Sequence, residues 1–297
     1  MWLHKTMNCF QLVKSVLDEL YEQVLDEHGN DTDKIIQEKL EHLRKTYENL
    51  RNGVDVDYGD AATRFAYIYR YTTAHANMVY EFIRDSESLT KTFDAETVNV
   101  SCIGGGPGSD FLGILKFMDL GLSTSLKKLK CYLCDQEKNW RESWADVDDK
   151  LGTSFPFSVS TVYWELDVTD VDESVAHTKI FNADLFTMIY FISELYSLRE
   201  DARAFFENMF DQAKPGALFL FVDNNAQSFY GWFDELAEEH DLECVKKENN
   251  IRFQTGGDEE ARDLDPYYDK FGYPKLGANI AYRIYRKVAR TTDLPDF

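Results

Sequence analysis

Three alternating glycines, Gly104, Gly106 and Gly108, interrupt the segment VNVSCIGGGPGSDFLGILKF, which covers residues 98–117. An apolar strand-like run precedes them and an apolar helix-like run follows. Glycine serves where the backbone takes a positive φ angle or where a ligand must touch the main chain. The turn from a strand into a helix is where many α/β proteins bind nucleotide-like ligands. These residues therefore predict a ligand-binding turn.

Two common ligand classes match this turn less well. A P-loop requires Lys-Ser or Lys-Thr after the glycines, and neither pair is present. A dinucleotide fingerprint, G-x-G-x-x-G, would start at Gly104 and end at Ser109, so its last glycine is missing. The spacing present is G-x-G-x-G. The class of ligand must therefore be inferred from the surrounding sequence.

Polar residues also follow two later strand-like runs. FISELYS contains Ser193 and Glu194, and VDNNAQSF contains Asp223 and Asn224. Doubly wound sheets place their binding groups at such strand ends. Asp223 is suited to orienting an amine or accepting its proton, but turn formation and helix capping explain Asp and Asn equally well.

The secondary structure around these groups begins with a helical segment over residues 1–95. Two amphipathic helices are expected to stop at Gly29 and Gly53, and a third is expected from about residue 60 to residue 84. One face of the third helix is a burial stripe. A second face carries a row of residues for which two interpretations stand, a solvated surface or a lid over a ligand: Arg64, Tyr67, Tyr71, His75 and Met78.

From residue 96 onward, short apolar runs alternate with helical patterns, which is typical of a parallel α/β sheet. The expected strands cover 98–103, 129–134, 159–164, 185–191 and 217–222, followed by LECVKK and NIAYRIYRK. The expected helices lie near 110–120, 137–150, 170–178, 198–212 and 228–240. The prediction is a doubly wound, Rossmann-like seven-stranded sheet over residues 96–290, with a helical cap over 1–95, a tail over 291–297, and the last two strands closing one edge.

A long connection runs from about residue 252 to residue 277. Long loops in compact domains are often lids or binding loops. Its aromatic residues are expected either to cover a substrate or to pin the loop to the sheet: Tyr267, Tyr268, Phe271 and Tyr273.

The ordered series of motifs over residues 98–286 resembles class I S-adenosylmethionine-dependent methyltransferases. Four features follow the order of motifs in that family: the glycine spacing, Asp135 after the second strand, Asp167 and Val168 after the third, and AKPGALFLFVD around the fifth. The resemblance implies the seven-stranded class I fold, S-adenosyl-L-methionine as cofactor, and methyl transfer by in-line displacement to an unidentified acceptor. A small molecule, a protein and RNA all remain open as acceptors.

The resemblance also implies roles for particular residues. The glycine turn would hold the cofactor, Asp135 would accept the ribose hydroxyls, and the fourth strand, with Tyr190, would pass below the methionine part. The residues beside the adenine would be Gln136, Asp167 and Val168. Arg64 or a tyrosine of the third helix would bond the methionine carboxylate. The predicted substrate-binding residues are Tyr71, Ser193, Glu194 and Asp223, and no catalytic residue is predicted, because methyl transfer needs a base only when the nucleophile arrives protonated.

Two features depart from the family pattern. Cys102 stands where the family usually has an acid, two residues before the first glycine, and polar Gln136 stands where an apolar residue often packs on adenine. They keep a second hypothesis open, a catalytically silent sensor or scaffold that binds S-adenosylmethionine. A third reading is an NAD(P)-dependent oxidoreductase.

Composition bears on partners and location. The net charge of −21 does not favour nucleic acid, which binds Lys/Arg patches, although a local basic groove is compatible with an acidic total. It mildly favours a neutral or cationic acceptor. The five cysteines and six histidines form no metal-ligand set, so no metal is expected. With no signal peptide pattern and no long uncharged stretch, we expect a cytoplasmic or nuclear protein without membrane partners.

Overall fold

The computed structural model describes residues 8–53, 56–121, 125–151, 155–170, 178–255 and 261–289. Seven strands form one sheet in the order β3-β2-β1-β4-β5-β7-β6. The strands are β1 Thr97–Ile103, β2 Lys128–Asp135, β3 Ser158–Glu165, β4 Leu185–Ile189, β5 Leu218–Asn224, β6 Leu242–Gln254 and β7 Gly277–Lys287. The first five are parallel, and β7 pairs antiparallel to both β5 and β6. The predicted fold class is confirmed, including the edge formed by the last two strands.

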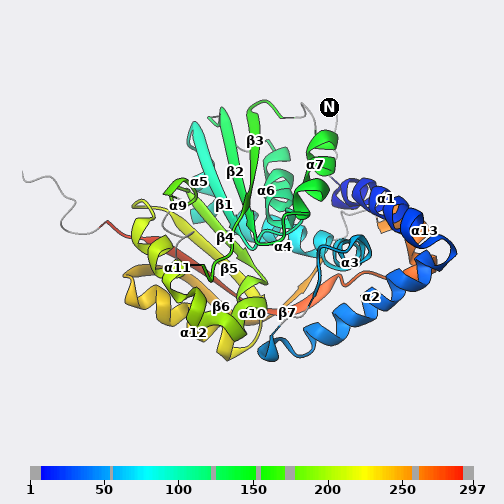
Figure 1. The fold of residues 1–297 in the computed structure, drawn as a ribbon. Helices are drawn as coiled ribbons and strands as arrows, with labels where there is room; N and C mark the ends of the chain where they lie inside the picture. Colours follow the sequence, from blue (N-terminus) through cyan, green and yellow to red (C-terminus); the bar gives the residue numbers. More distant parts are fainter. Residues whose placement is uncertain are drawn as a thin grey trace, which may run out of the picture.

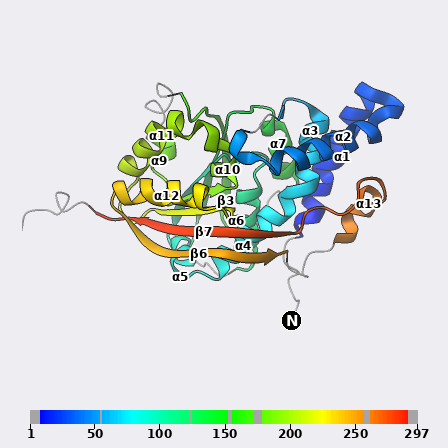
Figure 2. The ribbon, with the colours of Figure 1, turned by 90° about the horizontal axis from the view of Figure 1, so that it is seen from below.

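Helices cover both faces of the sheet (Figures 1 and 2). One face carries α6 Ser109–Asp119, α7 Trp140–Leu151 and the N-terminal helices. The other carries α9 Thr178–Phe181, α10 Phe191–Leu195, α11 Arg199–Gln212 and α12 Gln227–Glu239. Because both faces are covered, the central strands are continuous apolar runs, and all five residues of β4 are buried. The helix predicted near 170–178 falls largely on residues 171–177, and the tail at 291–297 follows residue 289, so both lie outside the described residues.

The N-terminal cap consists of α1 Cys9–His28, α2 Thr32–Tyr47, α3 Ala61–Tyr67, α4 Thr73–Arg84 and α5 Glu87–Thr92. The Asn8 side chain caps α1, and Gly29 ends it with φ 55°. The prediction that the second helix continues to Gly53 is wrong, because α2 ends at Tyr47. A short 3₁₀ turn, Leu50–Asn52, then leads to Gly53, whose φ is 96°. Asn52 and Gly53, after the end of α2, lie beside the carboxyl ends of the strands.

The predicted third helix is present but is not regular. Between α3 and α4 the segment Ile68–Thr72 is π-helical. Such segments are rare and frequently occur at functional sites. Helix α4 packs on α6 so closely that a Cβ atom on Gly113 would lie 2.3 Å from the Ala76 carbonyl oxygen. The cap and the sheet therefore share one continuous hydrophobic core.

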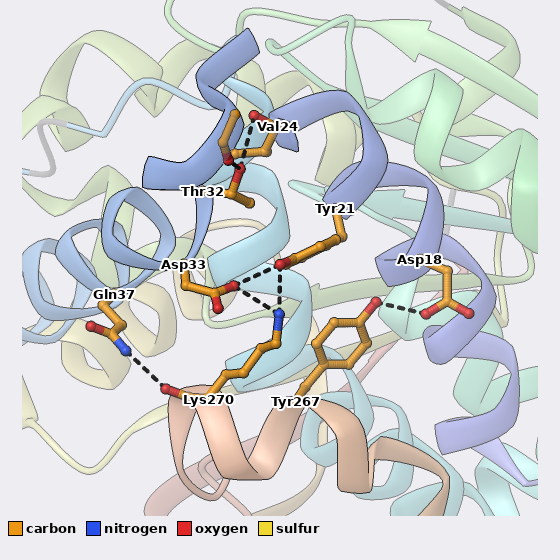
Figure 3. A network of polar contacts seen from close by, with 9 residues as sticks. Asp18, Tyr21, Val24, Thr32, Asp33, Gln37, Tyr267 and Lys270 are labelled. Carbon is orange, nitrogen blue, oxygen red and sulfur yellow. Dashed lines mark hydrogen bonds and ion pairs between the residues drawn. The ribbon is translucent and has the colours of Figure 1, made fainter. Parts of the chain in front are cut away.

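The connection between β6 and β7 docks on the cap (Figure 3). It contains a 3₁₀ turn, Ala261–Leu264, and α13, Asp265–Phe271. The Tyr267 hydroxyl donates to Asp18 of α1 at 2.6 Å, and Lys270 binds both Tyr21 of α1 and Asp33 of α2. Of the two roles left open for these aromatic residues, the described contacts favour pinning, although they pin the connection to the cap rather than to the sheet.

No helix among the described residues is long and apolar enough to span a membrane.

Candidate active site

A cavity of about 490 Å³ opens at the carboxyl ends of β1, β2, β3 and β4. Parallel strands end at the same edge of the sheet, so residues far apart in sequence meet there. The volume falls within the range of small-molecule and cofactor pockets. Seven of the eight predicted cofactor-binding residues line this main cavity: Gly104, Gly106, Asp135, Gln136, Asp167, Val168 and Tyr190. Gly108 does not line it.

The three glycines of the turn contact different neighbouring groups. A Cβ atom on Gly104 would lie 2.1 Å from the ring of Phe191, and φ at Gly104 is 67°. Gly108 begins α6 with φ 86°, and a Cβ atom there would lie 2.3 Å from the Trp144 ring. These two positions need glycine because protein side chains pack against them. Gly106 is the glycine beside Asp135, with the carboxylate oxygen 3.8 Å from its would-be Cβ.

Asp135 is fixed at the end of β2 by two backbone groups. The Gly106 N–H donates to its Oδ2 at 2.9 Å, and the Glu137 N–H donates to its Oδ1 at 3.0 Å. Burial raises the pKa of Asp135 to about 6, and the two backbone hydrogen bonds oppose that shift. A carboxylate oxygen accepts more than one hydrogen bond, so Asp135 retains acceptor capacity toward the cavity.

The segment after β3 lies along the cavity beyond Asp135. Asp167 accepts hydrogen bonds from the Thr169 N–H at 2.9 Å and from the Thr169 hydroxyl at 2.7 Å. Val168 is 8% exposed, and Gln136 is exposed. An apolar side chain with polar groups on either side suits a flat heterocycle, which offers a hydrophobic face and a polar edge.

One wall of the cavity comes from the cap and was not predicted. Four residues between α2 and α3 line the space opposite the strand ends: Asn52, Gly53, Val56 and Tyr58. The Trp140 ring lies 5.2 Å from the Tyr58 ring. The sequence carries no motif here. The one available signal was a Gly53 stop that left an unassigned stretch before the third helix.

A side chamber of about 40 Å³ adjoins the main cavity. Tyr67, Tyr190 and Glu194 line both spaces, so the two meet at these side chains. The remaining walls of the chamber come from α2, the π-helical segment, α4, α10, the end of β5 and the chain before β7: Tyr47, Tyr71, His75, Ser193, Asn224 and Lys275. Three of the four predicted substrate-binding residues, Tyr71, Ser193 and Glu194, are among the chamber residues.

The row of residues on the third helix is largely buried rather than solvated. His75 lies between two tyrosines, with ring centroids 4.5 Å from Tyr190 and 5.8 Å from Tyr71. Burial, reinforced by the charge of Lys275, lowers the pKa of His75 to about 3, so its imidazole is neutral. Tyr190 has φ 58°, a left-handed conformation that costs energy for a residue with a side chain and often marks a functional site.

Glu194 is the titratable carboxyl at the junction of the two spaces. The Tyr47 hydroxyl donates to its Oε1 at 2.8 Å, and the Tyr47 and Tyr58 hydroxyls bond to each other. Burial raises the pKa of Glu194 to about 8, with smaller raising effects from Asp135 and Asp223. Carboxyls whose pKa lies near neutrality are the ones suited to proton transfer.

Asp223 does not line either space. It is fully buried and accepts hydrogen bonds from the Ser193 N–H at 2.8 Å and the Asn224 N–H at 2.7 Å. Of the two roles considered for it, these contacts favour capping of α10, which fixes Ser193 and Glu194. Arg64 likewise lines neither space, and its guanidinium donates to the carbonyls of Tyr58 and Gly59. Arg64 thus stabilises the chain at Tyr58, which lines the main cavity.

Cys102 is fully buried in β1 and lies beside Cys131, with 3.6 Å between the sulfurs. Cys102 packs in the core and lines neither space. The replacement of the family's usual acid by cysteine therefore affects the core beneath the glycine turn. Within the described residues, no group of three or more His, Cys, Asp or Glu side chains is arranged to hold a metal ion.

The strand order, the glycine turn after β1 and the acid after β2 define a Rossmann-like protein of the class I methyltransferase type. The chain belongs to the family described as "Putative SAM-dependent methyltransferase", whose model matches residues 57–230. The match starts before β1, so it includes the third helix of the cap as well as the motif strands. No curated protein matches the chain.

Several solved structures resemble the fold at low identity. An O-methyltransferase family protein from Burkholderia thailandensis has 12% identity and a TM-score of 0.46, covering 77% of this chain and 61% of that one. An arsenic(III) S-adenosylmethionine methyltransferase from Chlamydomonas reinhardtii has 14% identity and a TM-score of 0.42, covering 75% and 76%. The YcgJ protein from Bacillus subtilis has 15% identity and a TM-score of 0.40, covering 73% and 99%.

The residues of the main cavity fit S-adenosylmethionine. Asp135 offers a carboxylate for a ribose, Val168 with its polar neighbours suits an adenine, and Tyr190 stands at the passage to the side chamber. When bound, the cofactor supplies an electrophilic methyl group on a sulfonium. The protein's own contribution is to bind, to align and to manage protons.

Proposed function

We propose that this methyltransferase holds S-adenosylmethionine in the main cavity and methylates a small molecule whose nucleophile enters the side chamber. One observation carries the proposal: Tyr67, Tyr190 and Glu194 line both spaces. In-line displacement needs donor and acceptor to meet across one short passage, and the shared residues mark such a passage.

The size and charge of the site support a small acceptor over a macromolecule. The chamber has room for only a few atoms and lies between the cap and the strand ends. RNA binding draws on clustered Lys and Arg, whereas the chain carries 53 acidic against 32 basic residues. In this proposal Asp135 binds the ribose, the Gly104–Gly106 backbone approaches the cofactor, and Gln136, Asp167 and Val168 surround the adenine.

Two measurements test the proposal. Calorimetry should give saturable binding of S-adenosylmethionine, and labelled cofactor should pass its methyl group to the small-molecule fraction of a cell extract. Binding without transfer to any fraction would favour the silent sensor. Transfer only to the protein or RNA fraction would overturn the small acceptor, and NAD binding without S-adenosylmethionine binding would overturn the assignment of the cavity.

A further inference from the structure

Two cations lie beside the ring of Tyr71, and neither has a carboxylate partner among the described residues. Lys275 lines the side chamber, whereas Arg70 does not. The Lys275 ammonium and the Arg70 guanidinium lie 5.8 Å and 5.7 Å from the centroid of the Tyr71 ring. The backbone N–H of Lys275 donates to the backbone carbonyl of Arg70 at 2.9 Å. This bond ties the chain before β7 to the π-helical segment.

Lys275 is exposed on its solvent side and forms no ion pair among the described residues. Partial desolvation by the neighbouring side chains lowers the pKa of Lys275, and the positive charge of Arg70 lowers it further. A carboxylate partner would raise it instead. An anionic group that enters the chamber would relieve this repulsion and gain a charge-assisted hydrogen bond.

Glu194 is the acidic group among the residues that line the same chamber. The chamber thus presents one cation, Lys275, and one carboxyl, Glu194, between aromatic walls formed by Tyr67, Tyr71 and Tyr190. Tyrosine ring faces and a carboxylate both favour an ammonium group. His75 adds no charge, because it is neutral.

We infer that the methyl acceptor is a small amino-carboxylate, whose carboxylate pairs with Lys275 and whose amine is deprotonated by Glu194. The inference rests on the proposed function, because it names the substrate class of the same site. A molecule that carries both charges complements the chamber, whereas a simple amine leaves Lys275 uncompensated and a simple acid gives Glu194 no proton to accept.

The proposed reaction balances as follows. The ionised Glu194 carboxylate takes one proton from the ammonium group, leaving a neutral amine. The nitrogen lone pair forms the new N–C bond to the methyl group, and the S–C bond breaks with its electron pair staying on sulfur. The sulfonium becomes a neutral sulfide, the product nitrogen becomes a methylated ammonium, and Glu194 returns its proton to water.

The groups around Glu194 suit this proton transfer. Glu194 interacts with three tyrosines of the cap and with two acidic residues at strand ends: Tyr47, Tyr58, Tyr67, Asp135 and Asp223. The three tyrosines are neutral, because burial raises their pKa values well above the usual range. The pKa of Glu194, about 8, lies much closer to that of an aliphatic amine, about 10, than an ordinary glutamate does.

The first experiment compares matched probes with the purified full chain. Glycine, β-alanine and 4-aminobutyrate are the amino-carboxylates, glycinamide lacks the carboxylate, and glycolate lacks the amine. At least one amino-carboxylate should be methylated, and both matched analogues should react at least about tenfold less well. Calorimetry of the same probes, with and without S-adenosylhomocysteine, should rank their affinities in the same order without any turnover.

The second experiment separates the two side chains. Lys275→Met should raise KM and Kd for the amino-carboxylate by about tenfold or more with little change in kcat, and Lys275→Arg should restore much of the affinity. Glu194→Gln should lower kcat/KM at pH 7 by about 100-fold. In the unaltered protein kcat/KM should rise as the pH passes about 8 and Glu194 ionises. In Glu194→Gln that rise should move to the pKa of the free amine.

Matched controls come from exposed residues away from the site. Lys247→Met on β6 and Glu238→Gln on α12 should leave KM and kcat/KM unchanged. Circular dichroism checks folding, and infrared titration of the protonated carboxyl should lose its component near pH 8 only in Glu194→Gln.

The inference and the proposed function fail in different ways. If S-adenosylmethionine does not bind, the proposed function fails. If it binds and labels small molecules, but glycinamide or glycolate reacts as well as the amino-carboxylates, or none of the probes reacts, the inference is wrong and the proposed function stands. An unchanged pH profile in Glu194→Gln would also overturn the role of Glu194.

Discussion

Asp135 shows how one residue joins structure to a predicted binding role. Its two oxygens accept the N–H groups of Gly106 and Glu137, so it fixes the glycine turn and the chain after β2. It also lines the main cavity. A carboxylate held rigidly by backbone donors is preorganised for a ligand that offers further hydroxyl donors.

We therefore expect Asp135→Asn to weaken S-adenosylmethionine binding by about 10- to 100-fold, because the amide turns one acceptor into a donor that faces an N–H group. Calorimetry of the variant measures the change in Kd. Asp94→Asn, an exposed position, is the control and should bind like the unaltered protein. Equal affinities for all three would refute the role of Asp135.

Gly104 gives a steric prediction at the same scale. Gly104→Ala places a methyl group in the ring of Phe191 and forces a positive φ angle on a residue with a Cβ atom. The backbone strain alone is worth about 1–2 kcal/mol. Denaturant unfolding should show at least that loss in the free energy of unfolding. Gly29→Ala is the comparison, since it shares the positive φ but meets no atom within 4 Å and should lose less.

At the scale of elements, the site depends on how α13 docks on the cap (Figure 3). The contacts from Tyr267 to Asp18 and from Lys270 to Asp33 tie together segments separated by more than 230 residues. Lys275 lies four residues after the end of α13, and its backbone N–H donates to the Arg70 carbonyl. The docked helix therefore determines where the chamber lysine lies.

We expect Tyr267→Phe to lower the free energy of unfolding by about 1 kcal/mol, because one hydrogen bond of a buried tyrosine is lost. Amide hydrogen exchange over residues 265–271 should accelerate while exchange in β4 and β5 does not change. Tyr273→Phe is the matched control, since its side chain is 75% exposed. Exchange that is equally slow in both variants would show that the Tyr267 contact does not hold α13.

At the scale of the whole molecule, several buried carboxyls make stability depend on pH. Burial raises the pKa values of Asp135 and Asp223 to about 6, of Asp110 to about 7 and of Glu194 to about 8. A group whose pKa is higher in the folded state stabilises fully below its unfolded pKa, and that stability is lost as the pH rises through the folded pKa. The molecule should thus be most stable in mildly acidic solution with respect to these groups.

Asp110 isolates this effect, because it is buried in α6 and accepts a hydrogen bond from Thr187 at 2.6 Å. Between pH 4 and pH 7 the melting temperature of the unaltered protein should fall relative to that of Asp110→Asn, because only the unaltered protein carries the buried Asp110 carboxyl. The share of one group is at most about 1.4 kcal/mol per pH unit between its two pKa values. Asp269→Asn, at an exposed position, should keep the original slope. The same slope in Asp110→Asn would contradict the prediction.

The sheet, the glycine turn and the acids at the strand ends could all be predicted from the sequence. These are local signals, since apolar runs form buried strands and glycine permits positive φ. Three features could be seen only in the tertiary structure. Phe191 and Trp144 pack against Gly104 and Gly108. Four cap residues, Asn52, Gly53, Val56 and Tyr58, line the main cavity, and Lys275 and Glu194 line one chamber. No sequence spacing encodes these contacts, because they join segments whose distance is set by how the helices of the cap pack on the sheet.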